Sequence, residues 1–456
     1  MHLWAAKHDQ LDALSISQHD LHLREQGIEI ELVARDFLQN HFLPAWAGLE
    51  LSVETTVTDR HFKARLDALV YDSAAQVYDL YEIKSATSVK KEHLVDVAFQ
   101  RLIAETNFPV RHTYLVHVNK DYTRTGPLEI SEMFQVVKVD EKVADVLAET
   151  RVAREAAWAV VTRETPDGIE DCLKPNGCPC SHLCHPGLPN YPIYDLPRLN
   201  QTKARQLKSD GVVSIQDIPE DFQLTGNQRA HAEVVWSGQP RINRKAIREA
   251  LARLEYPLYF LDYETFAPAI PEYDGYRPYQ HLVFQYSLHV FQHPDAQPDH
   301  HEFLAPHPGD PAKPLLEHLL PRIGTHGSVI VWNKPFEATR NREMAERYPE
   351  YADRLIQINA RIFDLMEIFK QGLYTHPDFH GSASIKNVLP VLVPDLSYDG
   401  LSIPKGDDAM MAWVEITKGH LSPEEIETTR QAMLEYCALD TLAMVRIWQV
   451  LEQSLQ

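Results

Sequence analysis

The sequence predicts an α/β protein with more than one domain. Its 456 residues exceed what one hydrophobic core usually supports. Strand-like and helix-like runs alternate in two regions, residues 1–165 and 255–456, and a stretch rich in Cys and Pro separates them. We therefore expect two α/β domains joined by a Cys-rich segment at 166–195 and a helical linker at 196–254.

The first region reads as a helix, a β-meander, a second helix and a further strand. Apolar side chains recur at helical spacing between Gly27 and Phe42, which predicts the first helix. Side chains alternate in the manner of β-strands on both sides of a turn at residues 72–75, which predicts a hairpin. The expected elements after the first helix are strands at 53–57, 63–71, 77–84 and 113–118 and a helix at 92–105.

The linker between Leu207 and Pro219 reads as a helix, a turn at Gly211 and the capped start of a second helix. This order is common in helix-hairpin-helix units that bind the DNA backbone, although a plain helical linker has the same pattern. Residues 241–254 form a basic amphipathic pattern, which predicts a helix leading into the last region.

The last region begins with short apolar runs and ends with a long helix. Ser422, Pro423 and Glu425 form a capping box with Pro at the first helical position, which predicts the start of that helix. The other expected elements are strands at 258–261, 282–291 and 328–332 and a loop at 292–313.

Composition and charge limit the classes of function. Hydrophobic residues make up 44% and charged residues 24% of the chain, which is typical of a soluble globular protein. No apolar run reaches the roughly 18–20 residues that a membrane helix needs, and Lys7 is too early for a signal peptide. We expect a cytoplasmic protein without a membrane partner. The net charge of −21 argues against nucleic-acid binding driven by charge alone.

One set of candidate site residues lies on the predicted hairpin. Asp67 is on its first strand, and Glu82 and Lys84 are two residues apart on its second strand, so both project from the same face. Two carboxylates can hold Mg²⁺ or Mn²⁺, and a lysine can activate water and neutralise phosphate. Glu31 could add a metal ligand, and Gln100 could position the metal or the water. A surface salt-bridge network is the alternative interpretation.

A second set of candidates lies in the last region. Asp262 and Glu264 are two residues apart at a strand end, and Glu337 opens a helical segment after a later strand. Tyr436 and Asp440 are four apart on the capped helix and therefore share a face. Four carboxylates can bind two metal ions that stabilise both reacting oxygens of a phosphodiester. Tyr436 would then hydrogen-bond the attacking water.

Three other residues of the last region have alternative interpretations. Asp364 is a spare carboxylate, but a structural residue at a strand end is the favoured interpretation. Lys386 could contact a substrate phosphate, but an exposed lysine is favoured. Cys437 is expected in the core.

Four of the five cysteines, Cys172, Cys178, Cys180 and Cys184, lie close together. Such clusters hold zinc or an iron–sulfur cluster more often than disulfides in a large chain with few cysteines. Free structural thiols are the alternative.

The first set of motifs resembles the RecB-like branch of the PD-(D/E)XK nucleases, which implies a restriction-endonuclease-like domain at 1–165. In related nucleases of that branch, one cysteine before the core and three after it hold an iron–sulfur cluster. Here no cysteine precedes Leu3-Trp4. Either that ligand is missing from the start of this chain, or Cys180 is the fourth ligand. Iron–sulfur is therefore favoured over zinc by resemblance alone.

The second set resembles the DnaQ-like (DEDD) exonucleases of the ribonuclease H-like fold, in the branch with a Tyr-x3-Asp motif. The resemblance implies a domain at 255–456 that releases nucleotides from 3′ ends. One departure is Glu337, where that superfamily normally has Asp. The whole arrangement, including Phe284-Gln285-Tyr286-Ser287, resembles an uncharacterised bacterial family that joins both nuclease types.

These observations predict a metal-dependent nuclease with two active sites and a nucleic-acid partner, with DNA favoured over RNA. The alternative is a nucleic-acid-binding or adaptor protein in which one or both nuclease sites have decayed. Glu337 and the acidic net charge keep this alternative open.

Overall fold

The chain folds as a mixed α/β protein with two compact units, which confirms the predicted α/β class. The computed structural model describes residues 1–11, 17–45, 48–169, 173, 175, 178–294 and 296–455. Unit 1 comprises Met1–Glu170 and Ala267–Gln280, and unit 2 comprises Asp171–Phe266 and His281–Gln456. The expected domain boundaries near residues 165, 195 and 254 stay predictions. Within the described chain, no helix is long and apolar enough to cross a membrane.

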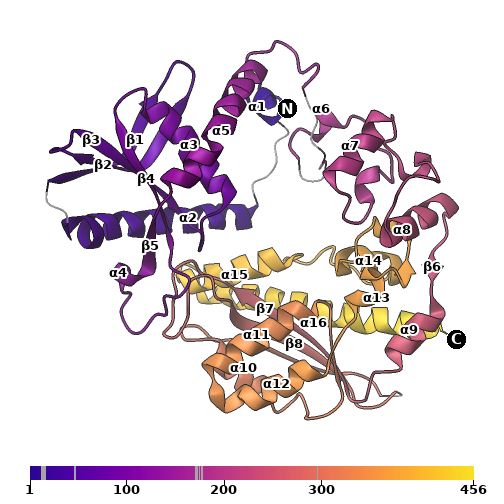
Figure 1. Ribbon diagram of the computed structural model, residues 1–456. Coiled ribbons are helices and arrows are strands. Elements are labelled where there is room, and N and C mark those ends of the chain that lie inside the picture. The colour runs from indigo at the N-terminus through magenta and orange to yellow at the C-terminus, as the bar shows by residue number, and fades with distance from the viewer. Residues whose placement is uncertain are drawn as a thin grey trace. The chain divides into compact units, whose positions relative to one another are not determined.

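Unit 1 contains a five-stranded sheet, with the strands in the order β1-β2-β3-β4-β5. All five strands are labelled in Figure 1. Only β3 and β4 pair in parallel, because α3 connects them as a crossover. Its elements are α1 (His2–Lys7), α2 (Gln18–Asp36), a π-helical turn (Phe37–Phe42), a 3₁₀ turn (Leu43–Ala45), β1 (Leu49–Thr58), β2 (Lys63–Asp72), β3 (Val77–Lys84), α3 (Lys91–Ala104), β4 (Val110–Val118), α4 (Ile130–Met133), β5 (Phe134–Lys138) and α5 (Asp140–Val161).

Helices cover both faces of this sheet. Ile30 and Ala34 of α2 pack against Tyr81 and Ile83 on one face. On the other face, α3 and α5 pack against the side chains that alternate with these, including Leu80. Helix α2, which was predicted to start at Gly27, starts earlier, at Gln18, because the hydroxyl of Ser17 accepts a hydrogen bond from the Asp20 amide and caps it.

Unit 2 contains a second mixed sheet, in the order β11-β10-β7-β8-β9, of which β7 and β8 are labelled in Figure 1. β7, β8 and β9 are antiparallel neighbours, and β10 and β11 run parallel to β7. From β7 onward, the elements of unit 2 are β7 (Leu258–Phe266), β8 (Leu282–Phe291), β9 (Asp299–Leu304), α10 (Ala312–Leu319), β10 (Ser328–Val331), α11 (Lys334–Arg347), a 3₁₀ turn (Pro349–Tyr351), α12 (Ala352–Ala360), β11 (Ile362–Asp364), α13 (Met366–Lys370), β12 (Tyr374–Thr375), a 3₁₀ turn (Pro377–Phe379), α14 (Ile385–Leu392), α15 (Gly406–Lys418) and α16 (Pro423–Gln453). Strand β12 lies outside the five-stranded sheet and pairs with β6 (Arg241–Ile242).

Two helical layers enclose this sheet. On one face, α10, α11 and α12 pack through Leu316, Met344 and Leu355. On the other face, Trp413 of α15 stacks on Phe284 of β8, with ring centroids 4.7 Å apart. The predicted cap of the last helix is confirmed, since the Ser422 hydroxyl accepts from the Glu425 amide in a capping box. The long α16 therefore presents its buried face to β7 and β8 along its length.

The segment before this sheet has its own small core in unit 2. Its elements are α6 (Ser181–Cys184), a 3₁₀ turn (Ile193–Asp195), α7 (Gln201–Ser209), a 3₁₀ turn (Ile215–Asp217), α8 (Gly226–Ser237), β6 (Arg241–Ile242) and α9 (Arg244–Leu251). Leu207, Ile215 and Val235 pack together at its centre. The turn after α7 uses Gly211 at φ +77°, a conformation that favours glycine.

Three predicted elements were wrong in detail. The predicted loop at 292–313 contains strand β9, because Asp299–Leu304 pairs with the long strand β8. The predicted helix at 241–254 starts at Arg244, since Arg241–Ile242 pairs with β12 and Asn243 caps the helix. The second helix expected after Gly211 is a single 3₁₀ turn, although Ser214 caps it as predicted.

Candidate metal sites

The first candidate site is built on the hairpin of β2 and β3. The carboxyl groups of Asp67 and Glu82 lie within hydrogen-bonding distance of each other. Asp67 also accepts a hydrogen bond of 2.9 Å from the Ile83 amide. Loss of hydration and the Glu82 charge raise the pKa of Asp67 to about 7. The two carboxyl groups therefore strongly favour binding of one proton, or of a cation in place of that proton.

Lys84 and Gln100 complete this group. The Lys84 ammonium lies 2.9 Å from Glu82 and 2.8 Å from Asp96. Burial alone would lower the lysine pKa, but these carboxylates raise it above its usual range. The Gln100 amide of α3 donates to the second Glu82 oxygen at 2.7 Å. The structure thus brings four of the five predicted residues together, and Asp96 is a partner that the sequence analysis missed.

Glu31 is the predicted member that the structure does not join to this group. It forms an ion pair with Arg35 and lies 3.9 Å from Arg65. The cause is the placement of α2, which packs on the Tyr81 and Ile83 face of the sheet. The role of Glu31 as a metal ligand stays a prediction.

A tyrosine from a distant part of the sequence lies beside this site. The hydroxyl of Ser85, the residue after Lys84, is 2.6 Å from that of Tyr279. Tyr279 belongs to the segment Ala267–Gln280, which connects β7 to β8 in the chain but belongs to unit 1. Its Ala269 is buried in the core that α2 covers. No local pattern around residue 279 signals this position.

The second candidate site centres on β7 and α16. Among the described residues, Asp262, Glu264 and Cys437 are the one group of three metal-ligating side chains whose ligand atoms lie within 4.8 Å of one another. The thiol sulfur of Cys437 lies 3.8 Å from an oxygen of Asp262. Cys437 is fully buried, as expected of a core residue, but its sulfur also borders the carboxylates.

Asp440 is held by two tyrosines on the other side of this site. The Tyr398 hydroxyl donates a 2.5 Å hydrogen bond to Asp440, and the Tyr436 hydroxyl also hydrogen-bonds to it. Burial raises the pKa of Asp440 to about 6, although both tyrosines lower it. Tyr436 and Asp440 therefore share a face of α16, as their spacing predicted. Tyr398 was not predicted, because nothing in its sequence context distinguishes it.

Lys386 is part of this site and not the exposed lysine that was favoured. Its ammonium lies 5.5 Å from the centre of the Tyr436 ring and 5.3 Å from that of Tyr398. It also donates to the Pro404 carbonyl at 2.9 Å. The lysine lowers the pKa values of Glu264 and Asp440, which burial raises. It is the cation that the structure places beside the carboxylates.

Glu337 and Asp364 differ in how their carboxyl groups are used. Glu337, in the first turn of α11, is 2% exposed, and its Oε2 has no hydrogen-bond partner among the described residues. Burial raises its pKa to about 8. Asp364 instead accepts from the amides of Lys334 and Met366, at 3.0 and 3.1 Å. Asp364 therefore has the structural position that was favoured for it, whereas Glu337 has an unused oxygen.

The carboxyl groups of the second site fit a divalent cation. Burial and the neighbouring Asp440 charge raise the pKa values of both Asp262 and Glu264 well above their usual range. Buried carboxylates are normally paired or bound to a metal, because an unpaired buried charge is costly. Oxygen ligands of this kind suit Mg²⁺ or Mn²⁺. Asp262, Glu264 and Asp440 are the residues that would hold such ions, with Glu337 as a further candidate.

The metal-free protein is expected to lose stability as the pH rises from about 4 to about 8. The pKa values of Asp440, Asp67 and Glu337 rise from 3.8, 3.8 and 4.5 to about 6, 7 and 8. A group with a raised folded-state pKa stabilises the fold fully below its unfolded pKa, and this contribution is lost as the pH rises through its folded pKa.

A cation that replaces these protons should reverse the loss. Mg²⁺ or Mn²⁺ should raise the unfolding temperature by about 4 °C or more at pH 8, and by less at pH 5. Thermal unfolding in EDTA and in each metal at both pH values measures the effect. An equal gain at pH 5 and pH 8 would contradict it.

The cysteine cluster is only partly described. Cys180 and Cys184 are buried and Cys178 is half-buried, and none of the three forms a disulfide bond with a described residue. Burial and the neighbouring Cys178 and Cys184 raise the pKa of the Cys180 thiol. Cys172 lies outside the described residues, and the three described sulfurs are not gathered within 4.8 Å of one another. Metal binding by the four cysteines stays a prediction.

Comparison with known proteins gives limited matches. Residues 259–384 match a family described as a domain of unknown function, DUF2779. The chain is 28% identical over 212 residues to "Uncharacterized protein MG366 homolog" of Mycoplasma pneumoniae, covering 42% of this chain and 32% of the relative. It is 27% identical over 236 residues to "Uncharacterized protein UU173" of Ureaplasma parvum, covering 46% and 33%. The chain thus spans about a third of these relatives' length. No solved structure matches.

The family match covers only part of the second site. Asp262, Glu264 and Glu337 lie within residues 259–384, whereas Tyr436 and Asp440 lie beyond them.

Proposed function

We propose that this chain is a metal-dependent nuclease with two active sites, which hydrolyses phosphodiester bonds of DNA, with RNA as the alternative substrate. The observation that carries the proposal is the second site. There, Asp262, Glu264 and Asp440 lie beside Tyr436 with raised pKa values and Lys386 as their nearby cation. Structural carboxylates are normally paired, so this arrangement favours a cation-binding role.

In the second site, the side chains have separate roles in 3′-to-5′ exonucleolysis. Bound Mg²⁺ or Mn²⁺ would stabilise the attacking and leaving oxygens of the phosphodiester. Tyr436 orients the attacking water through its hydroxyl, which already makes a hydrogen bond to Asp440. Lys386 lies on the Tyr436 ring and supplies positive charge toward the phosphate. Tyr398 fixes the Asp440 carboxylate.

In the first site, Asp67 and Glu82 would hold the metal ion. Lys84 is held between Glu82 and Asp96, so its ammonium remains charged and can stabilise the negative charge of the pentacoordinate transition state and orient the attacking water. Gln100 fixes the Glu82 carboxylate through its 2.7 Å hydrogen bond. Each site lies on a sheet that contains both parallel and antiparallel strand pairs and that is covered by helices. This architecture supports the resemblance to RecB-like and DnaQ-like nucleases.

A second candidate function is a nucleic-acid-binding or adaptor protein with decayed sites. The presence of Glu337 where related exonucleases have Asp, and the net charge of −21, favour it. Digestion of end-labelled single- and double-stranded DNA and RNA, with Mg²⁺ or Mn²⁺, distinguishes the nuclease from the binding or adaptor protein. Cleavage of any of these substrates supports the nuclease, and intact substrates together with measurable binding support the adaptor.

The cysteine cluster is proposed to hold an iron–sulfur cluster, with zinc as the alternative. We expect protein purified without oxygen to contain iron and sulfide in a stoichiometric amount, because four thiolates favour soft metal ions. Iron, sulfide and zinc analysis measures this, and Cys180→Ser should lower the metal content. Folded wild-type protein that contains none of these elements would exclude the site.

A further inference from the structure

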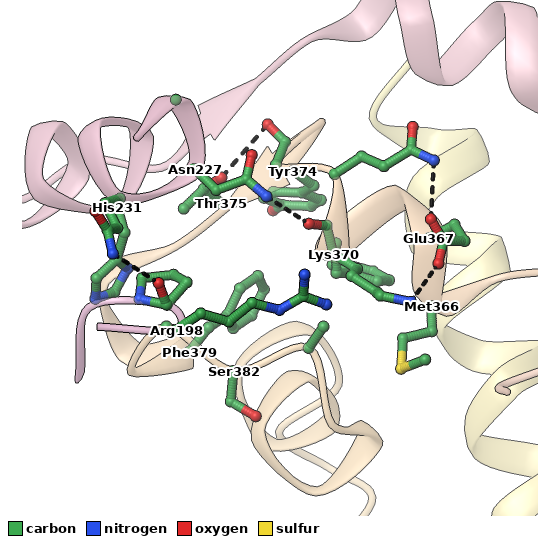
Figure 2. A pocket seen from close by; sticks show the side chains of 18 of the residues that line it. Arg198, Asn227, His231, Met366, Glu367, Lys370, Tyr374, Thr375, Phe379 and Ser382 are labelled. Carbon is green, nitrogen blue, oxygen red and sulfur yellow. Dashed lines mark hydrogen bonds and ion pairs between the residues drawn. The ribbon is translucent and has the colours of Figure 1, made fainter. Parts of the chain in front are cut away.

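A pocket of about 950 Å³ lies in unit 2, away from the carboxylates of the second site. One wall comes from the segment before the sheet and includes Arg198, Asn227 and His231, and the other runs from Met366 to Ala383 (Figure 2). The Asn227 amide joins the walls by donating to the Lys370 carbonyl at 3.0 Å. Pockets of about 300–1,000 Å³ accommodate small-molecule ligands. The volume therefore suits a ligand the size of a nucleotide.

Arg198 provides a positive charge in this pocket, and the carboxylate of Glu367, whose pKa is lowered by Lys370 and also by Arg198, is a counter-charge in the same lining. Its side chain extends between the two walls (Figure 2). No hydrogen bond or ion pair among the described residues holds its guanidinium, whereas the neighbouring Lys370 is paired with Glu367 at 2.7 Å. Arg198 also has φ +52°, which is uncommon for a residue with a side chain. An arginine so placed can bind phosphate through two parallel hydrogen bonds.

His231 is a second polar group without a partner. It is 1% exposed and lines the pocket, and neither of its ring nitrogens has a hydrogen-bond partner among the described residues. Buried polar groups are normally hydrogen-bonded, so this ring is positioned to meet a ligand or water. The first turn of α8, at Gly226 and Asn227, lines the same pocket. The Thr225 hydroxyl caps the Gln228 amide, which leaves the amides of Gly226 and Asn227 as the donors at the positive end of the helix dipole.

The opposite wall offers aromatic surface. Phe369, Tyr374 and Phe379 line the pocket and pack on one another, with ring centroids 5.8 to 6.0 Å apart. Ser382 adds a hydroxyl at the same wall. Aromatic side chains bind nucleobases by stacking without regard to base identity.

We propose that this pocket binds one nucleotide, with its phosphate on Arg198 and its base against Phe369, Tyr374 and Phe379. The His231 ring and the Ser382 hydroxyl hydrogen-bond the nucleotide. The combination of a guanidinium without a hydrogen-bond partner among the described residues, a helix N-terminus and an aromatic wall selects an aromatic anion of this size over a purely apolar ligand or a bare anion.

The pocket is connected to the second site through its wall. The Trp332 indole, at the end of β10, donates to the Ala383 carbonyl at 3.1 Å and stacks on Phe369. Lys386, which lies on Tyr436, follows this wall directly in the chain. A strand that has its end in the second site is therefore the natural source of the nucleotide. The assignment of a strand end as the source of the nucleotide rests on the proposed nuclease function, whereas binding of a free mononucleotide does not.

Calorimetry in EDTA with thymidine and adenosine 5′-monophosphates tests the pocket, because without metal these nucleotides cannot bind through a metal ion at the carboxylates. Arg198→Gly removes the guanidinium at a backbone conformation that glycine adopts freely, so the fold is retained. We expect its affinity to fall about tenfold or more. Lys245→Ala removes an exposed lysine of α9, with its side chain 87% exposed, and should bind like the wild type.

Three outcomes overturn the proposal. They are no binding of either mononucleotide by the wild type, equal affinity of Arg198→Gly and Lys245→Ala, and binding of inorganic phosphate as tight as that of the mononucleotides. A fluorescein-labelled thymidine decamer distinguishes the source of the nucleotide. If Arg198→Gly weakens decamer binding as well, the nucleotide belongs to a strand, and if only mononucleotide binding falls, it is a free nucleotide. Failure of nuclease activity with intact mononucleotide binding would remove the proposed function and not the pocket.

Discussion

Asp262→Asn is expected to lower the rate of 3′-to-5′ nucleotide release by about 10³-fold or more. Asp262 lies at the centre of the second site, where Asp440, Glu264 and Glu337 all act on its pKa. Asparagine has a similar size but no charge, so the site loses cation affinity and not its shape. The measurement is single-turnover digestion of 5′-labelled single-stranded DNA in Mg²⁺ or Mn²⁺, which resolves the products base by base.

The matched control is Asp299→Asn, an exposed aspartate at the start of β9. It should digest at the wild-type rate. Equal rates for Asp262→Asn and Asp299→Asn would exclude Asp262 from the reaction. Glu337→Asp should keep or increase activity if the site has the usual geometry. A collapse of activity in Glu337→Asp would mean that the longer side chain is adapted to this site.

Lys84→Ala is expected to lower cleavage at the first site by about 10² to 10³-fold. Its ammonium lies between the carboxylates of Glu82 and Asp96, and nothing else described at this site carries a positive charge next to Glu82. The Lys84→Ala change is measured in protein that also carries Asp262→Asn, so that the second site is inactive. Digestion of closed circular DNA, which has no 3′ end, then reports the first site alone.

The control for this change is Lys63→Ala, an exposed lysine at the start of β2. It should leave cleavage unchanged in the same background. Cleavage of the circle by the Lys84→Ala variant at the rate of Lys63→Ala would show that Lys84 has no part in the reaction. Circular dichroism spectra of both variants should show the wild-type fold, whereas Lys84→Ala should unfold at a lower temperature than Lys63→Ala, because it leaves the buried Glu82 carboxylate without its cation.

Local patterns predicted the elements that carry the sites. The strand at 77–84 is confirmed to the residue, because alternation on both sides of a short turn specifies a hairpin and its register. The cap at Ser422 likewise specifies where α16 begins, and the i, i+4 spacing then places Tyr436 and Asp440 on one face. These predictions depend on residues close in sequence.

Contacts between distant residues could not be predicted in this way. Tyr398 reaches Asp440 from a segment 42 residues away, and Tyr279 reaches Ser85 across 194 residues. Lys386 resembles any exposed lysine until α14 packs against α16. Strand β9 was not predicted, because the local strand preference of its residues, within the loop expected at 292–313, is weak. Pairing with β8 outweighs that weak preference.

The most direct test of the central claim is digestion of 5′-labelled single-stranded DNA in Mn²⁺ by wild-type protein and by Asp262→Asn. We predict a ladder of products that shortens from the 3′ end with the wild type, and an intact substrate with the variant over the same time. Intact DNA and RNA, single- and double-stranded, in both Mg²⁺ and Mn²⁺ with the wild-type protein would contradict the nuclease proposal.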